Sequence, residues 1–320
     1  MKDLLQTLKK LDYASLPISD DSRNRFLMLL PNVDYHLDIC HRCLRQMLDK
    51  SGCRASDIVM VDYGGGYGFL SLSAKAMGVG RVICVDSNPQ AVEAMQAVAD
   101  SVGVGPDDVL LGNAADLRQW CLSNNVVPNM LLGMDVIGHI YRLEDFFADL
   151  YAVNPALPML FTTAATPFNP RAVRRLRRIM QSDELGHGGK TGFHALRKRY
   201  ILNNFPEMKD WEADIWASDT RGLTYPDIYV AVASRTPHPL ADPFNTCDPS
   251  TGCWSERLLP IKDYQALLLP YHASLSVQNG FFNTHGRGFR GVLSRFLNHL
   301  PRRLFRPLAP FIILHISNHS

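Results

Sequence analysis

Acidic residues and glycines stand close together in one short segment, DYGGGYGFLSLSAKA (62–76). Asp62 precedes Gly64, Gly66 and Gly68, and glycine lets a backbone turn tightly and approach a ligand without a Cβ in the way. A second acid, Asp86, ends the apolar run RVICVD, where it can accept hydrogen bonds from both hydroxyls of a ribose. Together these residues predict a site for a ligand that contains a nucleoside.

The segments around these residues alternate between strand-like and helix-like patterns. Strands are expected in DIVMVDY (57–63), RVICVD (81–86), DVLLGNAADL (108–117), PNMLLGMDV (128–136) and PMLFTTAA (158–165), with helical patterns between most of them. This alternation, at intervals of about 25 residues, predicts an α/β fold with a parallel, doubly wound sheet. In such a sheet a ligand binds beyond the carboxyl ends of the strands.

Four motifs in a fixed order, DYGGGYG, VICVDSNP, LLGNAADL and GMDVIGHIYRLEDFF, resemble those of the class I S-adenosylmethionine-dependent methyltransferases. The resemblance covers roughly residues 55–235. It implies a Rossmann-like methyltransferase fold with a seven-stranded, mostly parallel sheet, closed by an antiparallel last strand. WEADIWASD (211–219) and DIYVAVAS (227–234) are the segments expected to supply the closing pair of strands.

The resemblance also implies the cofactor, S-adenosylmethionine, and the residues that hold it: Asp62, Gly64, Gly66, Gly68, Asp86, Ser87, Asn113, Ala114 and Asp135. Asn113 stands where the family commonly has an acid facing the adenine amino group, and an amide oxygen can still accept that hydrogen bond. Gly138 replaces the glutamate of a family pattern that Asp135, Val136 and His139 otherwise match.

Two alternatives of other classes remain. A nicotinamide-dependent oxidoreductase is the weaker one, because Phe69 or Ser71 stands where a dinucleotide fingerprint needs a third small residue. The other is a non-catalytic methyltransferase-like binding module, which the departures at Asn113 and Gly138 suggest.

Two histidines are candidate catalytic bases for an acceptor that must lose a proton. His139 follows the fourth expected strand, and His187 lies in the glycine-rich segment LGHGGKTGF (185–193). The expected acceptor is a small molecule, a saccharide or a lipid-linked compound. The basic residues of 171–199 suit an anionic group on it, although they also fit a solvated helix face.

The domain organisation is expected to have three parts. Residues 1–54 form a helical preface, and 55–235 form the methyltransferase domain, with 166–207 as a cap on the substrate side. Residues 236–320 form a proline-rich arm and a basic, amphipathic C-terminal extension.

The composition indicates the cellular compartment of the protein and argues against a membrane span and a metal site. Seven cysteines scattered over 320 residues favour a reducing, cytoplasmic compartment over a disulfide framework. No apolar run is long enough to cross a bilayer, and the N-terminal segment is typical of an amphipathic helix and not of a signal peptide. His36, Cys40 and Cys43 share a helix face but lack a fourth ligand, so no metal site is expected.

The last segment of the chain is strongly basic. No Asp or Glu follows Asp263, whereas six arginines do (287, 290, 295, 302, 303 and 306). Arginine interleaved with apolar residues over 286–316 indicates peripheral contact with the inner face of a membrane, or docking on the domain or on a second subunit of a homodimer. Nucleic acid is not expected as a partner, because no recognisable binding module accompanies the basic residues.

Overall fold

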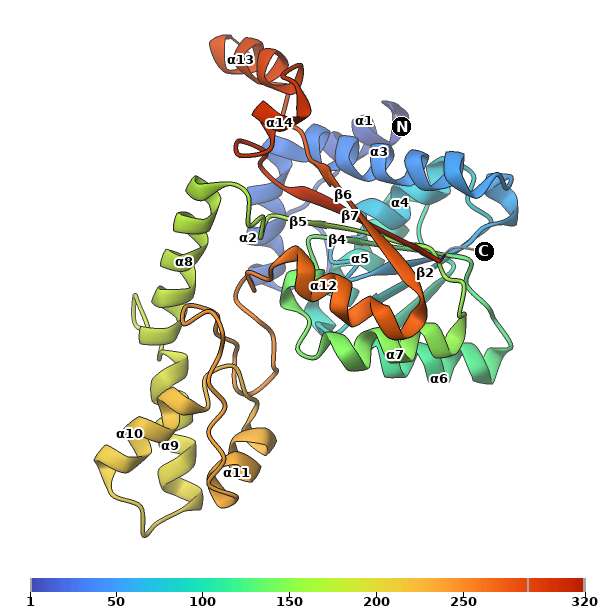
Figure 1. Ribbon diagram of the computed structural model, residues 1–320. Helices are drawn as coiled ribbons and strands as arrows, with labels where there is room; N and C mark the ends of the chain where they lie inside the picture. The colour runs from blue at the N-terminus through green and yellow to red at the C-terminus, as the bar shows by residue number, and fades with distance from the viewer. Residues whose placement is uncertain (1, 287, 319–320) are drawn as a thin grey trace.

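A single seven-stranded sheet forms the centre of the computed structural model, which describes residues 2–286 and 288–318 (Figure 1). The strand order is β3-β2-β1-β4-β5-β7-β6. The strands are β1 (Val59–Tyr63), β2 (Arg81–Asp86), β3 (Asp108–Leu111), β4 (Met130–Met134), β5 (Met159–Thr163), β6 (Ala273–Asn279) and β7 (Ile312–Asn318). Strands β1 to β5 pair in parallel, while β7 is antiparallel to both β5 and β6. The expected α/β class with a mostly parallel sheet of seven strands is confirmed.

Alternate residues of the central strands pack on opposite faces of the sheet. In β1, Met60 packs against α3 (Val33–Ser51) and α4 (Phe69–Ala76), whereas Val61 packs on the opposite face. That second face is covered by α6 (Ala114–Asn124), α7 (Leu143–Val153) and α12 (Ile261–Leu268), as Figure 1 shows. Because both faces are covered, the central strands are apolar almost throughout.

The preface contains three of the α-helices: α1 (Lys2–Lys10), α2 (Asp20–Leu29) and α3. Buried residues of α1 and α2 pack with α5 (Pro89–Val102), and α3 lies along α4. Short 3-10 turns occur at Leu30–Asn32, Ala55–Asp57, Ile137–His139 and Leu269–Tyr271. The described helices all fall short of the length and apolar character that crossing a bilayer requires.

The two segments expected to close the sheet are helices, so this prediction was wrong. Helix α10 (Asp210–Asp219) includes 211–219, and α11 (Tyr225–Ala233) includes most of 227–234. Ala213 and Ala217 are buried, whereas Ile215 between them, which would share their face in a strand, is 52% exposed, as helical spacing requires. The closing pair is β6 and β7, so the sheet extends beyond the expected domain boundary at 235.

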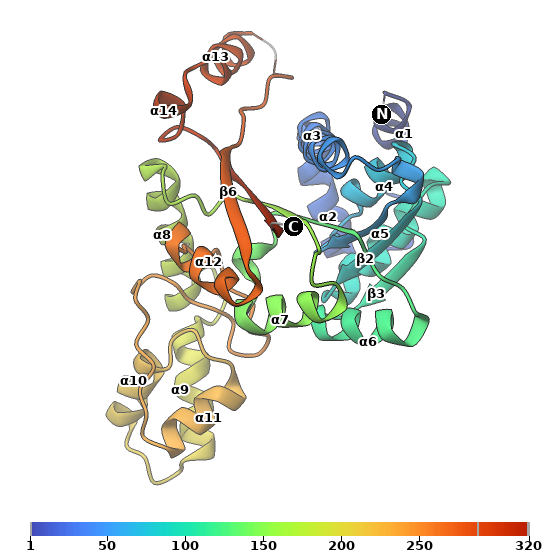
Figure 2. The ribbon, with the colours of Figure 1, turned by 45° about the vertical axis from the view of Figure 1, so that its right-hand side comes forward.

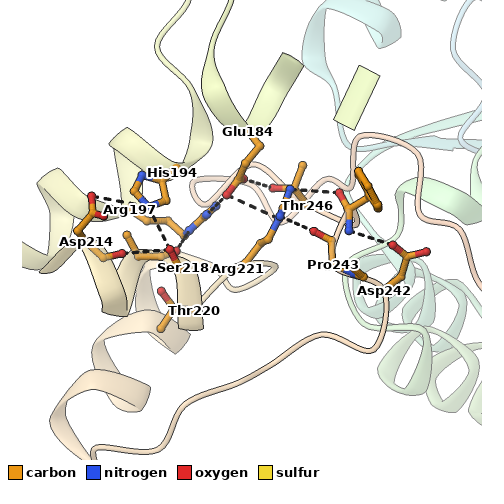
Figure 3. Close-up of polar contacts among 12 residues, drawn as sticks. Glu184, His194, Arg197, Asp214, Ser218, Thr220, Arg221, Asp242, Pro243 and Thr246 are labelled. Atoms are coloured by element: carbon orange, nitrogen blue, oxygen red, sulfur yellow. Dashed lines mark hydrogen bonds and ion pairs between the residues drawn. The ribbon is translucent and has the colours of Figure 1, made fainter. Parts of the chain in front are cut away.

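A helical lobe follows β5 in the chain and lies beside the sheet (Figures 1 and 2). It consists of α8 (Pro170–Leu185), α9 (Phe193–Asn204), α10 and α11. Figure 3 shows Glu184 of α8 between Arg197 of α9 and Arg221. Arg197 Nη2 lies 2.5 Å from Glu184 Oε1, and the Thr246 hydroxyl donates to Glu184 Oε2 over 2.7 Å. This buried network joins α8 and α9 to the turn after α10 and to the returning chain.

The Glu184→Gln substitution is expected to lower the free energy of unfolding by about 3–5 kcal/mol, because it leaves the fully buried Arg197 without its counter-charge. Burial tends to raise the pKa of Glu184, but the arginines and hydrogen bonds lower it below its usual value. The contribution is therefore present above the unfolded pKa and is lost as pH falls through the folded one. Urea denaturation at pH 7 and at pH 4 measures both effects. Glu93→Gln, on the exposed face of α5, is the control; equal stabilities of the two variants would contradict the prediction.

Candidate active site

The glycine turn between β1 and α4 has left-handed backbone at three positions. Gly64, Gly66 and Gly68 have φ angles of 71°, 54° and 79°. A Cβ at Gly64 would overlap Val136, and one at Gly68 would lie 2.6 Å from Met95 Cγ, so these two glycines are needed for packing. A Cβ at Gly66 would meet nothing closer than the Gly64 carbonyl at 4.0 Å. The turn is therefore open at Gly66, where a ligand can approach the backbone.

Asp62, near the end of β1, stabilises this turn. Its buried Oδ2 accepts hydrogen bonds from the Ser71 backbone N–H at 2.9 Å and from the Ser71 hydroxyl at 2.6 Å. Burial raises the pKa of Asp62 to about 6, although the bonds from Ser71 act in the opposite direction. This role of Ser71 was not predicted from the sequence. Asp62 ties β1 to the first turns of α4 and in this way shapes the glycine turn.

Asp86 faces the turn from the end of β2. Its Oδ2 accepts from the Gly66 N–H and its Oδ1 from the Asn88 N–H, each over 2.8 Å. A carboxylate has about four lone-pair sites, so two remain for the hydroxyls of a ribose. The structure thus joins the glycine turn to Asp86, which lies 20 residues after Gly66 in the sequence.

Two cavities lie at the carboxyl edge of the sheet. The larger has a volume of about 890 Å³, and seven of the predicted site residues line it: Gly64, Asp86, Ser87, Asn113, Ala114, Asp135 and His139. The smaller, of about 370 Å³, is lined mainly by apolar side chains, among them Tyr35, Ile39, Phe69, Leu70 and Phe311; Asp62 and Gly66 also line it. Gly68 lines neither cavity.

The cavities meet where the strand order reverses. Gly64, Met134 and Asp135 line both of them, and they follow or end β1 and β4, the two strands at the switch point of the sheet. A switch point is where open α/β sheets bind their ligands. This edge is therefore built to hold two ligand groups side by side.

Asp135 adopts an unusual backbone conformation at this junction. Its φ angle is 55°, in the left-handed region that Asp tolerates better than most residues. Its N–H donates to the Thr162 carbonyl over 3.0 Å, and its Oδ1 accepts from the Ala164 N–H over 2.8 Å. Local strain of this kind is often found at functional sites, and here β5 holds it in place.

The charges of the larger cavity favour a cationic ligand. Four carboxylates line it, from Asp86, Asp135, Asp145 and Asp149, against the guanidinium of Arg142 and the imidazole of His139, which is mainly protonated at pH 7. Arg142 pairs with Asp227 outside the lining and Asp149 with Arg118, whereas Asp86 and Asp135 have no cation within ion-pair distance among the described residues. A sulfonium fits this lining, and the Asp86 carboxylate keeps lone pairs free for the hydroxyls of a ribose. The pyrophosphate of a dinucleotide would be repelled.

Asn113 has a structural task that the sequence did not indicate. It is the N-cap of α6, and its amide oxygen accepts from the Ala115 and Asp116 backbone N–H groups at 2.8 and 3.4 Å. Its side-chain oxygen is therefore occupied twice. The contact implied for Asn113, acceptance of a hydrogen bond from the adenine amino group, stays a prediction and would compete with the helix cap, because the free amide nitrogen can only donate.

The two candidate catalytic histidines lie in different surroundings. His139 lines the larger cavity, and its Nδ1 lies 2.7 Å from the Trp254 carbonyl oxygen. Hydrogen bonding to Cys253, and then to Trp254, raises the pKa of His139 to about 9 against the effect of burial. His187 is exposed in the loop after α8 and lines neither cavity. Their catalytic roles stay predictions.

Two sets of residues that line the cavities were not predicted from the sequence. Thr251, Gly252 and Cys253 line the larger cavity, although they come from the segment interpreted as a linker or surface arm. Their place depends on contacts between Trp254 and the turn at His139, for which one sequence holds no signal. His36 lines the smaller cavity, and the expectation for it concerned only metal binding. Burial lowers the pKa of His36, although Asp135 acts against it.

Most of the remaining candidate groups lie away from the cavities, but Cys40 lines the smaller one. Cys40 and Cys43 are buried, and burial raises the pKa of both thiols, that of Cys43 to about 12. None of the basic residues of 171–199 lines either cavity. Arg197 and Arg177 pair with Glu184 and Asp242 in the lobe.

Comparison with known proteins finds a family match for one segment of the chain. Residues 39–142 match the model of a family described as ribosomal protein L11 methyltransferase (PrmA). A ribosomal protein L11 methyltransferase from Aeromonas hydrophila subsp. hydrophila is 38% identical over 91 residues, which are 28% of this chain and 30% of that relative. The chain thus spans less than a third of the length of this curated relative.

Solved structures with a similar fold include two described proteins. The plantazolicin methyltransferase BamL, solved in complex with a triazolic desmethylPZN analog and SAH, has a TM-score of 0.44 at 12% identity, over 100% of this chain and 96% of that chain. The YcgJ protein from Bacillus subtilis has a TM-score of 0.42 at 13% identity, over 88% of this chain and 100% of that chain.

The Asp86→Ala substitution is expected to weaken binding of S-adenosylhomocysteine roughly 10- to 100-fold, because a charge-assisted hydrogen bond contributes about 1.5–3 kcal/mol. Isothermal titration calorimetry measures the affinity. Asp100→Ala, on the exposed side of α5, removes the same charge outside the cavity and should bind like the wild type. An unchanged affinity of the Asp86 variant would exclude this residue as a ligand.

Proposed function

We propose that this protein transfers a methyl group from S-adenosylmethionine to a small acceptor, since its residues 39–142 belong to the class I S-adenosylmethionine-dependent methyltransferases. The observation that carries the proposal is the junction of two cavities at Gly64, Met134 and Asp135. One cavity has the free carboxylates that a ribose and a cation need, and the other has an apolar lining suited to a second molecule.

The chain's own residues align the reactants. S-adenosylmethionine, when bound, supplies a methyl group already activated on a sulfonium sulfur, so alignment is the main task left to the protein. Asp86 would hold the ribose, and the open backbone at Gly66 would let the ligand approach closely. Asp135, fixed by Thr162 and Ala164, would present its negative field at the point where the cavities meet.

The lining of the smaller cavity supports an acceptor with an apolar part. Tyr35, Ile39, Phe69, Leu70 and Phe311 favour an aromatic or aliphatic group over a highly charged one. We therefore infer a small molecule, a saccharide derivative or a lipid-linked compound, and we do not extend the proposal to an anionic group bound by 171–199. The Aeromonas relative is named for a ribosomal protein, so a protein acceptor is the alternative to be separated by experiment.

His36 is the better candidate for a proton acceptor near neutral pH. It lies in the smaller cavity, stacked on Phe69, and its lowered pKa keeps the imidazole neutral. His139, with a pKa of about 9, is mainly protonated at pH 7 and would act as a base only in alkaline solution. His187 would need a closing movement of its loop to take part.

The pH dependence of the reaction distinguishes these histidines. With an acceptor that loses a proton, kcat/KM of the wild type should fall tenfold per pH unit below the pKa of His36, which lies under its usual value of about 6.5. His36→Gln should lack this limb and should be slower by about 10²- to 10⁴-fold at pH 7. His139→Gln is the matched variant and should retain the limb. An acid limb that persists in His36→Gln would exclude His36 as the base.

The proposed activity is tested with methyl-labelled S-adenosylmethionine and fractionated cell extract. Label is expected in the small-molecule or lipid pool, and the Asp86→Ala variant should transfer much less. Label in protein or RNA only would overturn the proposed acceptor class. Cofactor binding without transfer into any pool would favour the binding-module alternative instead.

A further inference from the structure

A helical hairpin is inserted between the last two strands of the sheet and stands away from it (Figures 1 and 2). It comprises α13 (Phe289–Asn298) and α14 (Arg302–Phe305). Its base is firmly held, because the Gly280 N–H donates to the Phe311 carbonyl over 2.8 Å and Asn298 exchanges two hydrogen bonds with the Phe282 backbone. The hairpin is thus a defined projection of the fold.

One face of this projection is apolar and uncovered. Phe289, Val292 and Phe296 follow one another at helical spacing and are 79%, 57% and 64% exposed. Leu293 and Leu304 are also exposed beside them. Since the base of the hairpin is held by other residues, these side chains contribute little to the stability of the fold. An apolar patch of this kind is typical of an interaction surface.

The same projection carries free positive charge. Arg295, Arg302 and Arg303 are exposed and form no ion pair within the described part of the chain, and no acidic residue follows Asp263 in the sequence. Arg306 stacks on the Phe168 ring, 3.6 Å from its centroid, close to the base of the hairpin. Arg287 lies outside the described residues. The hairpin therefore combines an apolar face with cations and has no acid to neutralise them.

We propose that the α13–α14 hairpin docks on the surface of an anionic lipid bilayer. The apolar face would enter the boundary between headgroups and acyl chains, and the arginines would contact anionic headgroups. Ten residues of helix span about 15 Å, so α13 lies in the interface and does not cross it. A second copy of the chain is a poorer partner, because a two-fold contact sets the arginines of both copies against each other.

The base of the hairpin adjoins the smaller cavity. Pro310 and Phe311, which line that cavity, follow directly after the hairpin, and the Tyr35 hydroxyl donates to the Phe281 carbonyl before it. A docked hairpin would bring the apolar cavity close to the lipid surface. The proposal does not rest on methyl transfer, since it concerns only the binding of the chain to lipid.

Vesicle flotation with the full chain tests the apolar contact. The wild type is expected to float with vesicles of phosphatidylglycerol and phosphatidylcholine and much less with phosphatidylcholine alone. Val292→Asp should lower the partition coefficient at least about tenfold. It removes an apolar side chain that would be buried in the bilayer, and it places a negative charge against the anionic lipid surface. The matched control is Val230→Asp in α11, where the valine is 63% exposed; it should bind like the wild type.

A second pair of variants tests the charge contact independently. Arg295→Ser with Arg303→Ser should reduce binding about tenfold or more at low salt, since each arginine near an anionic surface contributes a factor of about five. Arg171→Ser with Arg174→Ser removes the same two charges from the exposed side of α8 and should leave binding unchanged. All variants change exposed residues, and an unchanged melting curve verifies their folding.

Three results would overturn the proposal. The wild type could fail to bind anionic vesicles, or each hairpin variant could bind them as well as its matched control. Sedimentation velocity could instead show a dimer that Val292→Asp dissociates, which would assign the apolar face to a second copy of the chain. Loss of vesicle binding without loss of methyl transfer to a soluble acceptor would support docking and leave the proposed activity intact.

Discussion

The buried carboxylate of Asp62 is the constraint on which the site depends. It accepts two hydrogen bonds from Ser71, so the end of β1 and the first turns of α4 are held at a fixed separation. The chain between them must turn sharply, which requires the left-handed glycines and exposes the backbone at Gly66. Asp86 then joins the turn through the Gly66 N–H. A single desolvated acid thus organises the first motif, the second motif and the edge of the larger cavity.

The sheet supplies the second half of the arrangement. β4 and β5 are fixed to each other at Asp135 by contacts to Thr162 and Ala164, which places a strained acid at the junction of the cavities. The carboxylates there and at Asp86 explain why a cation suits this edge and a pyrophosphate does not. The apolar cavity on the other side of Gly64 is completed by Phe311, which leads into the last strand.

Much of this could be predicted from the sequence because it is local. The strand, glycine turn and helix at 57–76 and the acid at the end of β2 are defined by neighbouring residues. The prediction of the closing strands was wrong because WEADIW in α10 alternates in part as a strand does, and IYVAVA in α11 is an apolar run of strand length. In β7 the apolar run is interrupted by His315, although residues 312–316 are all buried. Cys253 and His36 reach the cavities through long-range packing, and periodicity in one sequence holds no information about such contacts.

The position of β7 sets an order of events during synthesis. β5 obtains its antiparallel neighbour only from residues 312–318, after the lobe, α12, β6 and the hairpin have all been made. Until then β5 presents an unpaired edge, and the apolar residues that β7 buries, such as Leu314, have no place to pack. The pairing of β7 with β5 is therefore a late, non-local step of folding. A chain that stops within the hairpin retains the whole glycine turn but leaves the edge of β5 unpaired and prone to aggregation with other nascent proteins.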